Sequence, residues 1–492
     1  MTYRNRSLAP QLRLELAWQA YQQQGFYGAI TDLARSFGVS RWLVYHLLHV
    51  VVPLLLEVAT PKRPVPHPLV REVRVDKRHL DRAIVTLRVV GDVSLEGIQR
   101  SLEEILGVHR SIGYLSQAIA QAQQEAMDFQ RRLVYRVSGP GLLDELFQHR
   151  KPMLVVVEPY STALLVLSQE EHRDGDTWGG HLLELEEQGF HLTRVASDDA
   201  RGIAAGVQAA LGEDALHQLD IGHLFGEVAR VDAEVERSAY KHLREEEERW
   251  HVLDSARSDR VITSRIHAWE KAHQKAEEAI LLYDDFHYLA EELYGLFSPV
   301  GPTGAPRSRA AVQGDLEALL SLLEEIPTAK VQELRTRLKS QQKGLLLFWG
   351  DWEQRLTQLR ERIPQEELLQ ALLLDYFLGK RKPTQAIEKA REKTNAFLET
   401  HLGEQAPLLQ KQVASTLDGL VRSSSLVETA NSWMRPYLNT RKGVSQPFLD
   451  LIRLYRNTRT YRRGKRKGHS PFELLGVSLP EDWLSMVGLP RS

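Results

Sequence analysis

The spacing of apolar residues predicts two helices near the start of the chain. Residues 31–47 have the pattern of helix, tight turn and helix, with Gly38 suited to the turn and Ser40 placed to cap the second helix. The apolar seam shared by these helices consists of Leu33, Ala34, Val39, Val44 and Leu47. Residues 1–59 are therefore predicted to form a helix-turn-helix domain, with an ordinary helical hairpin as the alternative.

A second helical pair is predicted within residues 79–137. It consists of a helix over 94–106, a turn at Gly107 and a helix from about residue 110. The positions with helical spacing are Leu95, Ile98, Leu102, Ile105, Val108, Ile112 and Leu115. Few basic residues point outward from this pair, so a helix-turn-helix and a plain helical hairpin are equal alternatives.

The apolar period changes after Ser138-Gly139-Pro140-Gly141, which has the composition of a break between elements. Three short strands are then predicted at 142–148, 152–159 and 162–168, and the nearly all-apolar second strand suits the interior of a sheet. A helix over 177–188, a strand over 191–197, a helix over 201–211 and a strand over 215–221 follow. This order predicts an α/β fold in which a three-stranded meander continues into crossover units.

Residues 226–421 are long, charged and helical in spacing, with helices expected within 227–288, 316–341 and 345–379. Four aromatic residues in this region are expected to pack a core, with stacking on a flipped base as the alternative: Phe348, Trp349, Trp352 and Tyr376. The region is predicted to be an all-α domain for DNA clamping or dimerisation. The pattern does not choose between these two roles.

Composition narrows the class of protein. The 492 residues are enough for several domains, and the net charge of -2 gives no indication of a partner. Cysteine is absent, which excludes disulfides, thiolate zinc sites and cysteine nucleophiles and fits a reducing cytosol. The most apolar stretch, residues 44–58, is interrupted by His46, His49 and Pro53 and is too short to span a bilayer. A cytoplasmic protein without a membrane partner is expected.

Local charge indicates contact with nucleic acid at two places. Residues 1–82 contain twice as many Lys and Arg as Asp and Glu, and residues 60–78 form a basic, proline-rich linker. A basic run near the end of the chain, interleaved with tyrosines, is expected to lie along DNA phosphates rather than to be a solvated face. The expected DNA-binding residues are Arg41, Trp42, Tyr45 and His46 on the second helix, Lys62 and Arg63 in the linker, and Arg453, Arg456, Arg459, Arg462, Arg463, Lys465, Arg466 and Lys467.

A late helix carries polar residues along one face. Three serines at 423–425 can cap its start, and Glu428, Asn431 and Arg435 follow at spacings of one or two turns. A carboxylate with a base two turns away suits a site that binds metal ions and a phosphate backbone. Pro436 directly after Arg435 disturbs the direction in which this arginine points.

Together these residues carry a resemblance. Asp144 in the first strand, Asp198 directly after the fourth and Glu428 on the late helix resemble the Asp-Asp-Glu triad of bacterial insertion-sequence transposases. The segments Ser425-Leu426-Val427-Glu428, Arg435-Pro436-Tyr437-Leu438 and residues 461–474 are similar to the closing motifs of that family. The resemblance implies an RNase H-like catalytic domain formed by 138–225 and 422–492, interrupted by an all-α insertion at 226–421.

The resemblance also implies a site. Asp144, Asp198 and Glu428 would be catalytic and would hold two Mg²⁺ ions, with Mn²⁺ as a substitute, because hard cations prefer oxygen ligands. Glu158 is an alternative to Asp144, and Asp199 an alternative to Asp198. Three further residues are expected to assist, although the histidine can equally be hydrogen-bonded at a strand end: His223, Asn431 and Arg435.

The expected function is that of a DNA transposase. It would bind double-stranded element ends and target DNA as a homodimer or higher oligomer, in the nucleoid-containing bacterial cytoplasm. Two rival functions are a domesticated or inactive relative that acts as a DNA-binding regulator, and an RNase H-like DNA-repair nuclease that cuts without joining.

Overall fold

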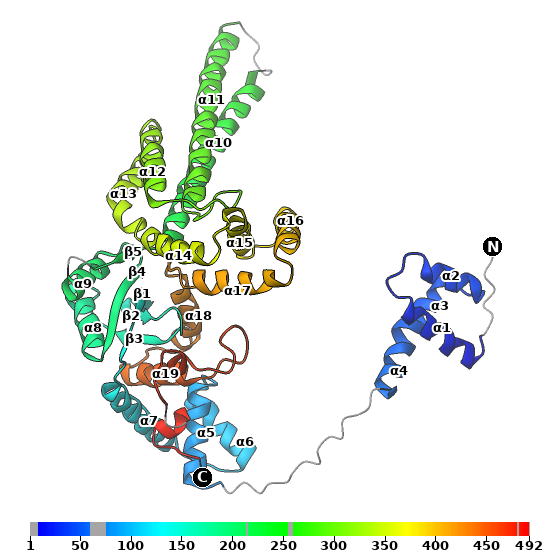
Figure 1. Ribbon diagram of the computed structural model, residues 1–492, viewed down its shortest axis with the longest axis vertical. Helices are drawn as coiled ribbons and strands as arrows, with labels where there is room; N and C mark the ends of the chain where they lie inside the picture. Colours follow the sequence, from blue (N-terminus) through cyan, green and yellow to red (C-terminus); the bar gives the residue numbers. More distant parts are fainter. Residues whose placement is uncertain (1–7, 60–74, 213–214, 254–258, 480–481, 492) are drawn as a thin grey trace. The chain divides into compact units, whose positions relative to one another are not determined.

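The computed structural model describes residues 8–59, 75–212, 215–253, 259–479 and 482–491. The chain divides into two compact units, Met1–Arg74 and Val75–Ser492. In the described residues helices predominate, and a single five-stranded sheet lies in the second unit (Figure 1). The α/β class predicted for the middle of the chain is therefore confirmed.

The N-terminal unit contains the predicted helix, turn and helix. Its elements are α1 (Pro10–Gln22), α2 (Ala29–Ser36), α3 (Arg41–His46), the π-helical turn η1 (Leu47–Val51) and α4 (Val52–Ala59). Gly38 has a φ of 64°, and the Ser40 hydroxyl accepts a hydrogen bond from the Leu43 N–H at 3.3 Å. All five predicted seam residues are buried in the core of this unit.

A sharp bend separates these helices. The chain turns by 111° between Ala29–Ser36 and Arg41–Leu56, within the range of helix-turn-helix motifs. In the described part of the chain, no single helix combines the length and apolar character needed to cross a membrane, and this bent pair meets that requirement only when its two helices are taken together.

The second helical module is only partly as predicted. Helices α6 (Leu95–Leu106) and α7 (Ile112–Arg132) flank a turn at Gly107, with Ser94 and Ser111 as caps. Ile105 is 76% exposed and Ile112 37% exposed, so including them in the seam was wrong. The reason is a third helix, α5 (Lys77–Val89), which packs on α6 and α7 and supplies two buried residues of the small core, Leu80 and Ile84.

This module shares its packing with the sheet. Ala122 and Ala126 of α7, with Val85 and Val89 of α5, belong to the same hydrophobic core as the strands. The predicted boundary near residue 137 therefore does not separate two cores. Helix α5 also begins inside the predicted linker 60–78, of which residues 60–74 lie outside the described residues.

The sheet has the spatial order β3-β2-β1-β4-β5. The first three strands form an antiparallel meander, and β4 and β5 run parallel to β1. Crossover helices α8 and α9 precede β4 and β5. The bounds are β1 (Val137–Gln148), β2 (Lys151–Val157), β3 (Leu164–Gln169), α8 (Gly175–Glu187), β4 (Phe190–Ser197), α9 (Arg201–Leu211) and β5 (His217–Leu219). The predicted order of elements is confirmed, and β2 lies inside the sheet.

The segment Ser138–Gly141 was wrongly predicted to be a break. It lies inside β1 and pairs with β4, with a register shift between Gly139 and Pro140. Proline has no backbone N–H, so a bulge at this point lets the strand pass without a ladder hydrogen bond. A Cβ at Gly141 would lie 2.7 Å from the Leu192 side chain, so a larger residue there would require that side chain to shift.

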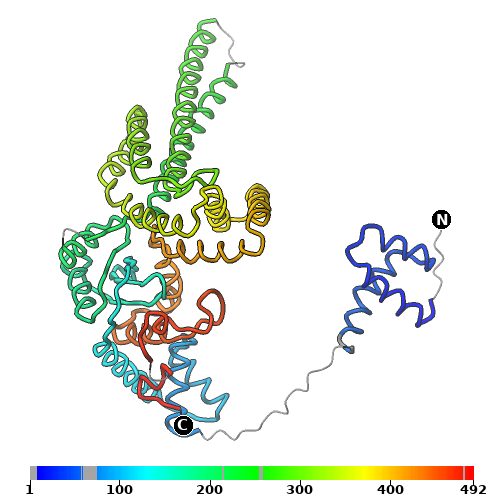
Figure 2. The backbone as a smooth tube through the Cα atoms, viewed as in Figure 1, coloured from blue at the N-terminus to red at the C-terminus, as the bar shows by residue number. Residues whose placement is uncertain are grey.

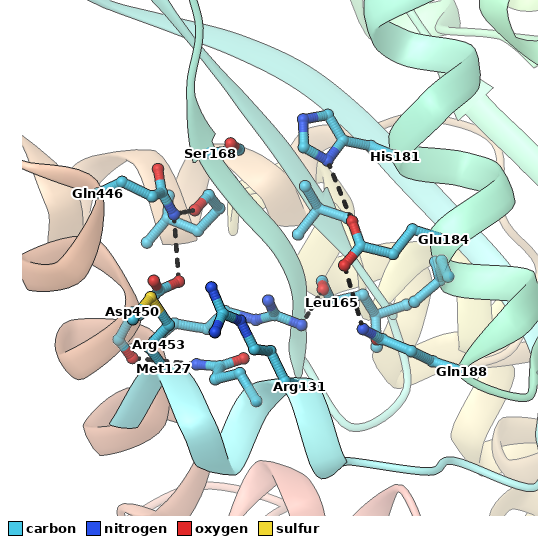
Figure 3. A pocket seen from close by; sticks show the side chains of 14 residues that line it. Met127, Arg131, Leu165, Ser168, His181, Glu184, Gln188, Gln446, Asp450 and Arg453 are labelled. Carbon is cyan, nitrogen blue, oxygen red and sulfur yellow. Dashed lines mark hydrogen bonds and ion pairs between the residues drawn. The ribbon is translucent and has the colours of Figure 1, made fainter. Parts of the chain in front are cut away.

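One edge of the sheet is covered by side chains of α19 (Gln446–Thr458). The Gln446 amide accepts from the Gln169 N–H at 2.9 Å and donates to the Leu167 carbonyl at 3.0 Å. Asn457 exchanges two 2.8 Å hydrogen bonds with the backbone of Leu164. Figure 3 shows Gln446 and Arg453 reaching toward this edge beside a small polar pocket. Helix α19 therefore occupies the place of a sixth strand.

Between β5 and the last part of the chain lies a helical insertion with its own core. Its elements are α10 (Ile221–Leu253), α11 (Asp259–Leu296), α12 (Arg309–Glu324), α13 (Ala329–Leu345), α14 (Phe348–Arg362), α15 (Glu366–Leu378), α16 (Gln385–Leu402), η2 (Gly403–Gln405) and α17 (Ala406–Leu417). Phe348, Trp349 and Trp352 are fully buried and Tyr376 packs against the same core, so the packing prediction is confirmed. The α10–α11 hairpin projects from the rest of this unit (Figure 2).

The chain returns to the sheet with α18 (Ser425–Asn439), which packs on β1 and β2. Two short helices, α20 (Pro471–Leu474) and α21 (Trp483–Met486), follow α19. Phe472, Leu484 and Val487 join the core of the sheet. The sheet, its crossover helices and the C-terminal helices therefore share one core, and the insertion contributes a second.

Candidate active site at the carboxyl end of the sheet

Strand register brings three aspartates to one level of the sheet. Leu142 of β1 pairs with Ala196 of β4, and two residues further along these strands are Asp144 and Asp198. Ser197 of β4 pairs with Leu219 of β5, and these two residues are followed by Asp198 and Asp220, respectively. Because the three strands are parallel and adjacent, these acids lie side by side, with Asp198 and Asp220 at the carboxyl ends of β4 and β5 and Asp144 beside them within β1.

Asp144 is hydrogen-bonded through both of its carboxylate oxygens. Its Oδ1 accepts a hydrogen bond from the Glu145 N–H at 2.8 Å, and its Oδ2 accepts one from Asn431 Nδ2 at 2.6 Å. Burial, the largest cause, and the charges of Asp198 and Glu428 raise the pKa of Asp144 to about 6, against the opposing effect of the two hydrogen bonds. The charges of Asp198 and Glu428 therefore act on Asp144, less strongly than its burial does.

Helix α18 presents its polar face to this carboxylate. Asn431 is 2% exposed and, apart from its bond to Asp144, has an amide oxygen with no hydrogen-bond partner among the described residues. Glu428 lies one turn earlier on the helix and is exposed. Arg435 Nη2 lies 3.6 Å from Glu428 Oε2, although Pro436 stands within the helix. The predicted shared face is confirmed, and the exposed ion pair contributes little stability.

Asp198 and its neighbour Asp199 have different surroundings. Asp198 Oδ1 accepts from the Ala200 N–H at 3.1 Å, whereas Asp199 Oδ2 accepts from Gln341 Nε2 of α13 at 2.6 Å. Asp199 also lies 4.0 Å from Arg337. The Asp199 carboxylate therefore reaches across to the insertion.

Glu158, the alternative to Asp144, forms hydrogen bonds within a turn. It is 3% exposed, and its oxygens accept from the Tyr160 N–H at 2.8 Å and the Ser161 N–H at 2.7 Å. The Ser161 hydroxyl donates to the same carboxylate. These bonds close the turn between β2 and β3, and they leave Glu158 with a structural role.

Asp220 joins the two ends of the insertion. Its Oδ1 accepts from the N–H groups of Gly222 at 2.7 Å and His223 at 3.3 Å, at the start of α10. Its Oδ2 accepts from the N–H and the hydroxyl of Ser424, at the start of α18. The predicted serine cap of α18 is confirmed in part, since Ser424 makes no side-chain cap and donates to Asp220, whereas the Ser423 hydroxyl accepts from the Ser425 N–H at 3.4 Å. The His223 side chain is exposed on the first turn of α10.

The basic tail divides into two groups. The first group bonds to the protein itself. Arg453 donates to the Leu164 carbonyl at 3.0 Å, Arg456 is 8% exposed, Lys465 pairs with Asp418 at 2.6 Å, and Arg466 donates to the Tyr160 carbonyl at 2.7 Å. For these four residues a contact with DNA phosphates stays a prediction, and the structure shows contacts within the protein that the sequence did not indicate. The second group is exposed, and within the described residues its side chains make no ion pair or hydrogen bond: Arg459, Arg462, Arg463 and Lys467.

The predicted recognition helix keeps its outer face open. Trp42 is 69% exposed and Tyr45 49% exposed, and Arg41 and His46 are exposed beside them. The rings of Trp42 and His46 are stacked with centroids 5.0 Å apart. Lys62 and Arg63 of the linker lie outside the described residues.

Sequence reasoning missed a second group of charged residues near these acids. Arg355, Lys380, Asp418 and Arg422 line one pocket together with the loop that carries Lys465. They come from three separate segments of the chain, since only Asp418 and Arg422 are near in sequence, so no local pattern could have brought all four together.

The donor set suits a hard cation, although the side chains do not form a closed ligand group. Within the described residues, no three His, Asp or Glu side chains lie close enough to hold a metal ion. The chemistry nevertheless fits Mg²⁺, because Asp144, Asp198 and Glu428 supply carboxylate oxygens and Asn431 an unpaired buried amide oxygen. A cation at this point would relieve the repulsion that raises the pKa of Asp144.

Comparison with known proteins gives no further information. No protein-family model matches the sequence. A search of curated proteins found no match either. The function is therefore argued from the site itself.

Proposed function

We propose that the chain is a DNA transposase whose catalytic domain is RNase H-like and interrupted by the helical insertion. The order β3-β2-β1-β4-β5, with an acid on β1, another directly after β4 and a third on the helix that follows the insertion, supports this proposal. The enzyme acts on double-stranded DNA as a homodimer or higher oligomer, in the bacterial cytoplasm. Its N-terminal helix-turn-helix unit binds the element ends.

The hydrogen bond between Asn431 and Asp144 carries the proposal. It fixes the polar face of α18 against β1, so that Glu428 acts electrostatically on the same carboxylate as Asp198. A buried carboxylate that other acids act on is unfavourable without a compensating partner, because like charges repel. Such an arrangement is typical of a site that takes up cations.

The residues of the chain have distinct roles in this proposal. Asp144, Asp198 and Glu428 hold two divalent cations, Mg²⁺ or Mn²⁺, and Asn431 orients Asp144 through its amide N–H. Asp220 keeps the start of α18 next to the end of β5 and thereby holds Glu428 near the sheet. When bound, the cations would stabilise the attacking and leaving oxygens of an in-line displacement at phosphorus.

Replacement of one acid tests the proposal. Glu428→Gln should bind DNA as the wild type does and lose Mg²⁺-dependent strand cleavage, because the exposed side chain contributes little to the fold. Glu361→Gln, at an exposed glutamate of α14, is the matched control and should cleave normally. Cleavage by Glu428→Gln at the wild-type rate would refute the triad.

Joining distinguishes the proposal from a repair nuclease. A transposase should transfer a 3′-hydroxyl end into target DNA, whereas a nuclease of the same fold should cut without joining. DNA binding with neither cutting nor joining in Mg²⁺ or Mn²⁺ would favour a DNA-binding regulator.

A further inference from the structure

A pocket beside the candidate active site has a strongly positive lining. It has a volume of about 670 Å³ and lies between the β2–β3 turn, the helical insertion, the segment before α18 and the loop that follows α19. Its wall contains five cationic side chains and one carboxylate, which are Arg355, Lys380, Arg422, Lys465, Arg466 and Asp418. Leu142, two residues before Asp144, and Ser425, three residues before Glu428, also line it. The pocket therefore adjoins the acids of the site.

Arg422 is the cation that the protein leaves unpaired. Its guanidinium lies 5.9 Å from the centroid of the Phe377 ring, and within the described residues it makes no ion pair or hydrogen bond. Burial lowers the pKa of this group, yet an arginine remains charged in proteins. A partly buried guanidinium has five N–H donors, and leaving them without acceptors is unfavourable.

Two neighbouring arginines are already engaged. Arg355 donates to the Asp351 carboxylate at 3.1 Å and to the Gly419 carbonyl at 3.1 Å. Arg466 donates to the carbonyl oxygens of Pro159 at 2.9 Å and Tyr160 at 2.7 Å. These two side chains shape the wall of the pocket, and Arg422 is left as the open donor.

Asp418 occupies the place of an anion between two lysines. Its Oδ1 lies 2.7 Å from Lys380 Nζ and accepts from the Tyr376 hydroxyl at 3.0 Å, and its Oδ2 lies 2.6 Å from Lys465 Nζ. A phosphate oxygen would form the same charge-assisted bonds with these lysines. The carboxylate thus competes for them with any anion that enters.

We propose that this pocket binds a backbone phosphate of the DNA close to the cleaved bond, with Arg422 as its direct contact. Asp418 acts as an internal competitor that holds Lys380 and Lys465 until the phosphate arrives. The identification of the ligand as DNA rests on the proposed function. The cationic lining itself requires only a phosphate group.

The full-length chain can be titrated with a short duplex of mixed sequence at several salt concentrations. Arg422→Gln should weaken binding and reduce the log–log salt slope by about 0.9, the value for one lost phosphate contact on duplex DNA. Asp418→Asn should do the opposite, since it frees two lysines and removes a negative charge. Arg244→Gln, an exposed arginine in the far half of α10, is the matched control for the loss of one charge.

Opposite effects of the two variants separate binding from folding. A merely structural role would make both variants less stable and neither tighter, so thermal unfolding is measured in parallel, and Arg422→Lys should restore part of the slope. The inference would be overturned if Arg422→Gln had the same salt slope as the control variant Arg244→Gln. It would also be overturned if Asp418→Asn did not bind the duplex more tightly than the wild type.

The outcomes also separate this inference from the proposed function. A wild-type chain that does not bind duplex DNA overturns both. Wild-type binding that Arg422→Gln leaves unchanged overturns the inference alone. A third outcome uses inorganic pyrophosphate as the ligand. If pyrophosphate raises the melting temperature of the wild type but not of Arg422→Gln, and the variant binds DNA normally, the pocket binds a free phosphate compound. That result would overturn its assignment to DNA.

Discussion

Asn431 Nδ2 lies 2.6 Å from Asp144 Oδ2, and this hydrogen bond joins residues 287 positions apart in the sequence. It connects the two parts of the chain on either side of the helical insertion. It also favours the ionised form of Asp144, because a donor to a carboxylate stabilises its negative charge. The pair therefore links the assembly of the site to its protonation.

Asn431→Ala should shift the acidic limb of the cleavage rate profile to higher pH. The hydrogen bond lowers the pKa of Asp144, so its loss raises that pKa above about 6 and delays ionisation as the pH rises. The measurement is the Mg²⁺-dependent cleavage rate against pH for both proteins. A limb at the same pH in the variant would show that Asp144 does not control it.

Asp144→Asn should abolish cleavage and stabilise the metal-free protein at neutral pH. The pKa of Asp144 is about 6 in the folded chain and 3.8 in the ordinary reference, so the folded state binds its proton more tightly. The Asp144 carboxyl therefore contributes its full share of the free energy of unfolding below pH 3.8. This contribution, at most about 3 kcal/mol, is lost as the pH rises through the folded pKa of about 6. Denaturant unfolding of the wild type and Asp144→Asn, below pH 3.8 and above pH 6, tests whether the variant becomes the more stable protein at the higher pH.

The variants Asp198→Asn and Asp199→Asn should differ. Asp198 acts on Asp144 and should be needed for cleavage, with little effect on stability. Asp199 bonds to Gln341 in the insertion, so its variant should retain cleavage and lose less than about 1 kcal/mol of stability, as expected for an exposed contact. Cleavage assays and melting temperatures for the two variants test this difference. The reverse pattern would place the metal ligand one residue later.

Two substitutions in the basic tail should separate DNA binding from folding. Arg462→Gln should lower the salt slope of duplex binding by up to about 0.9 without changing the melting temperature, because the side chain is exposed. Arg456→Gln should lower the melting temperature, since Arg456 is buried beside the rings of Trp433 and Tyr461. If Arg462→Gln and the wild type had equal salt slopes, the exposed basic side chains of the tail would be facing solvent and not DNA.

Local patterns predicted most of the sheet. Apolar runs such as β2 and the alternation before Ser197 depend on neighbours in sequence, so their elements were placed within a few residues. Pairing with β4 decided that Ser138–Gly141 is part of a strand, and no pattern within that segment reveals its partner. Long-range pairing overrode the local preference of glycine and proline for a turn.

The same distinction applies to the site. Asp144, Asp198 and Glu428 could be selected because each has a recognisable place in its own element. The acceptors of Arg453 and Arg466 are backbone carbonyls of the β3 edge and the turn before it, which exist only after the chain has folded. The anion pocket around Arg422 could not be predicted for the same reason, as its wall is formed by distant segments.

The covering of β3 by α19 has a consequence for association between molecules. An uncovered strand edge is a template on which another chain can add a strand, and this risk grows where several copies gather at one place. Gln446 and Asn457 already take up backbone groups at this edge, so a neighbouring copy finds fewer free donors and acceptors there. Under the proposed function, copies gathered on one DNA molecule would be protected from edge-to-edge aggregation at this strand.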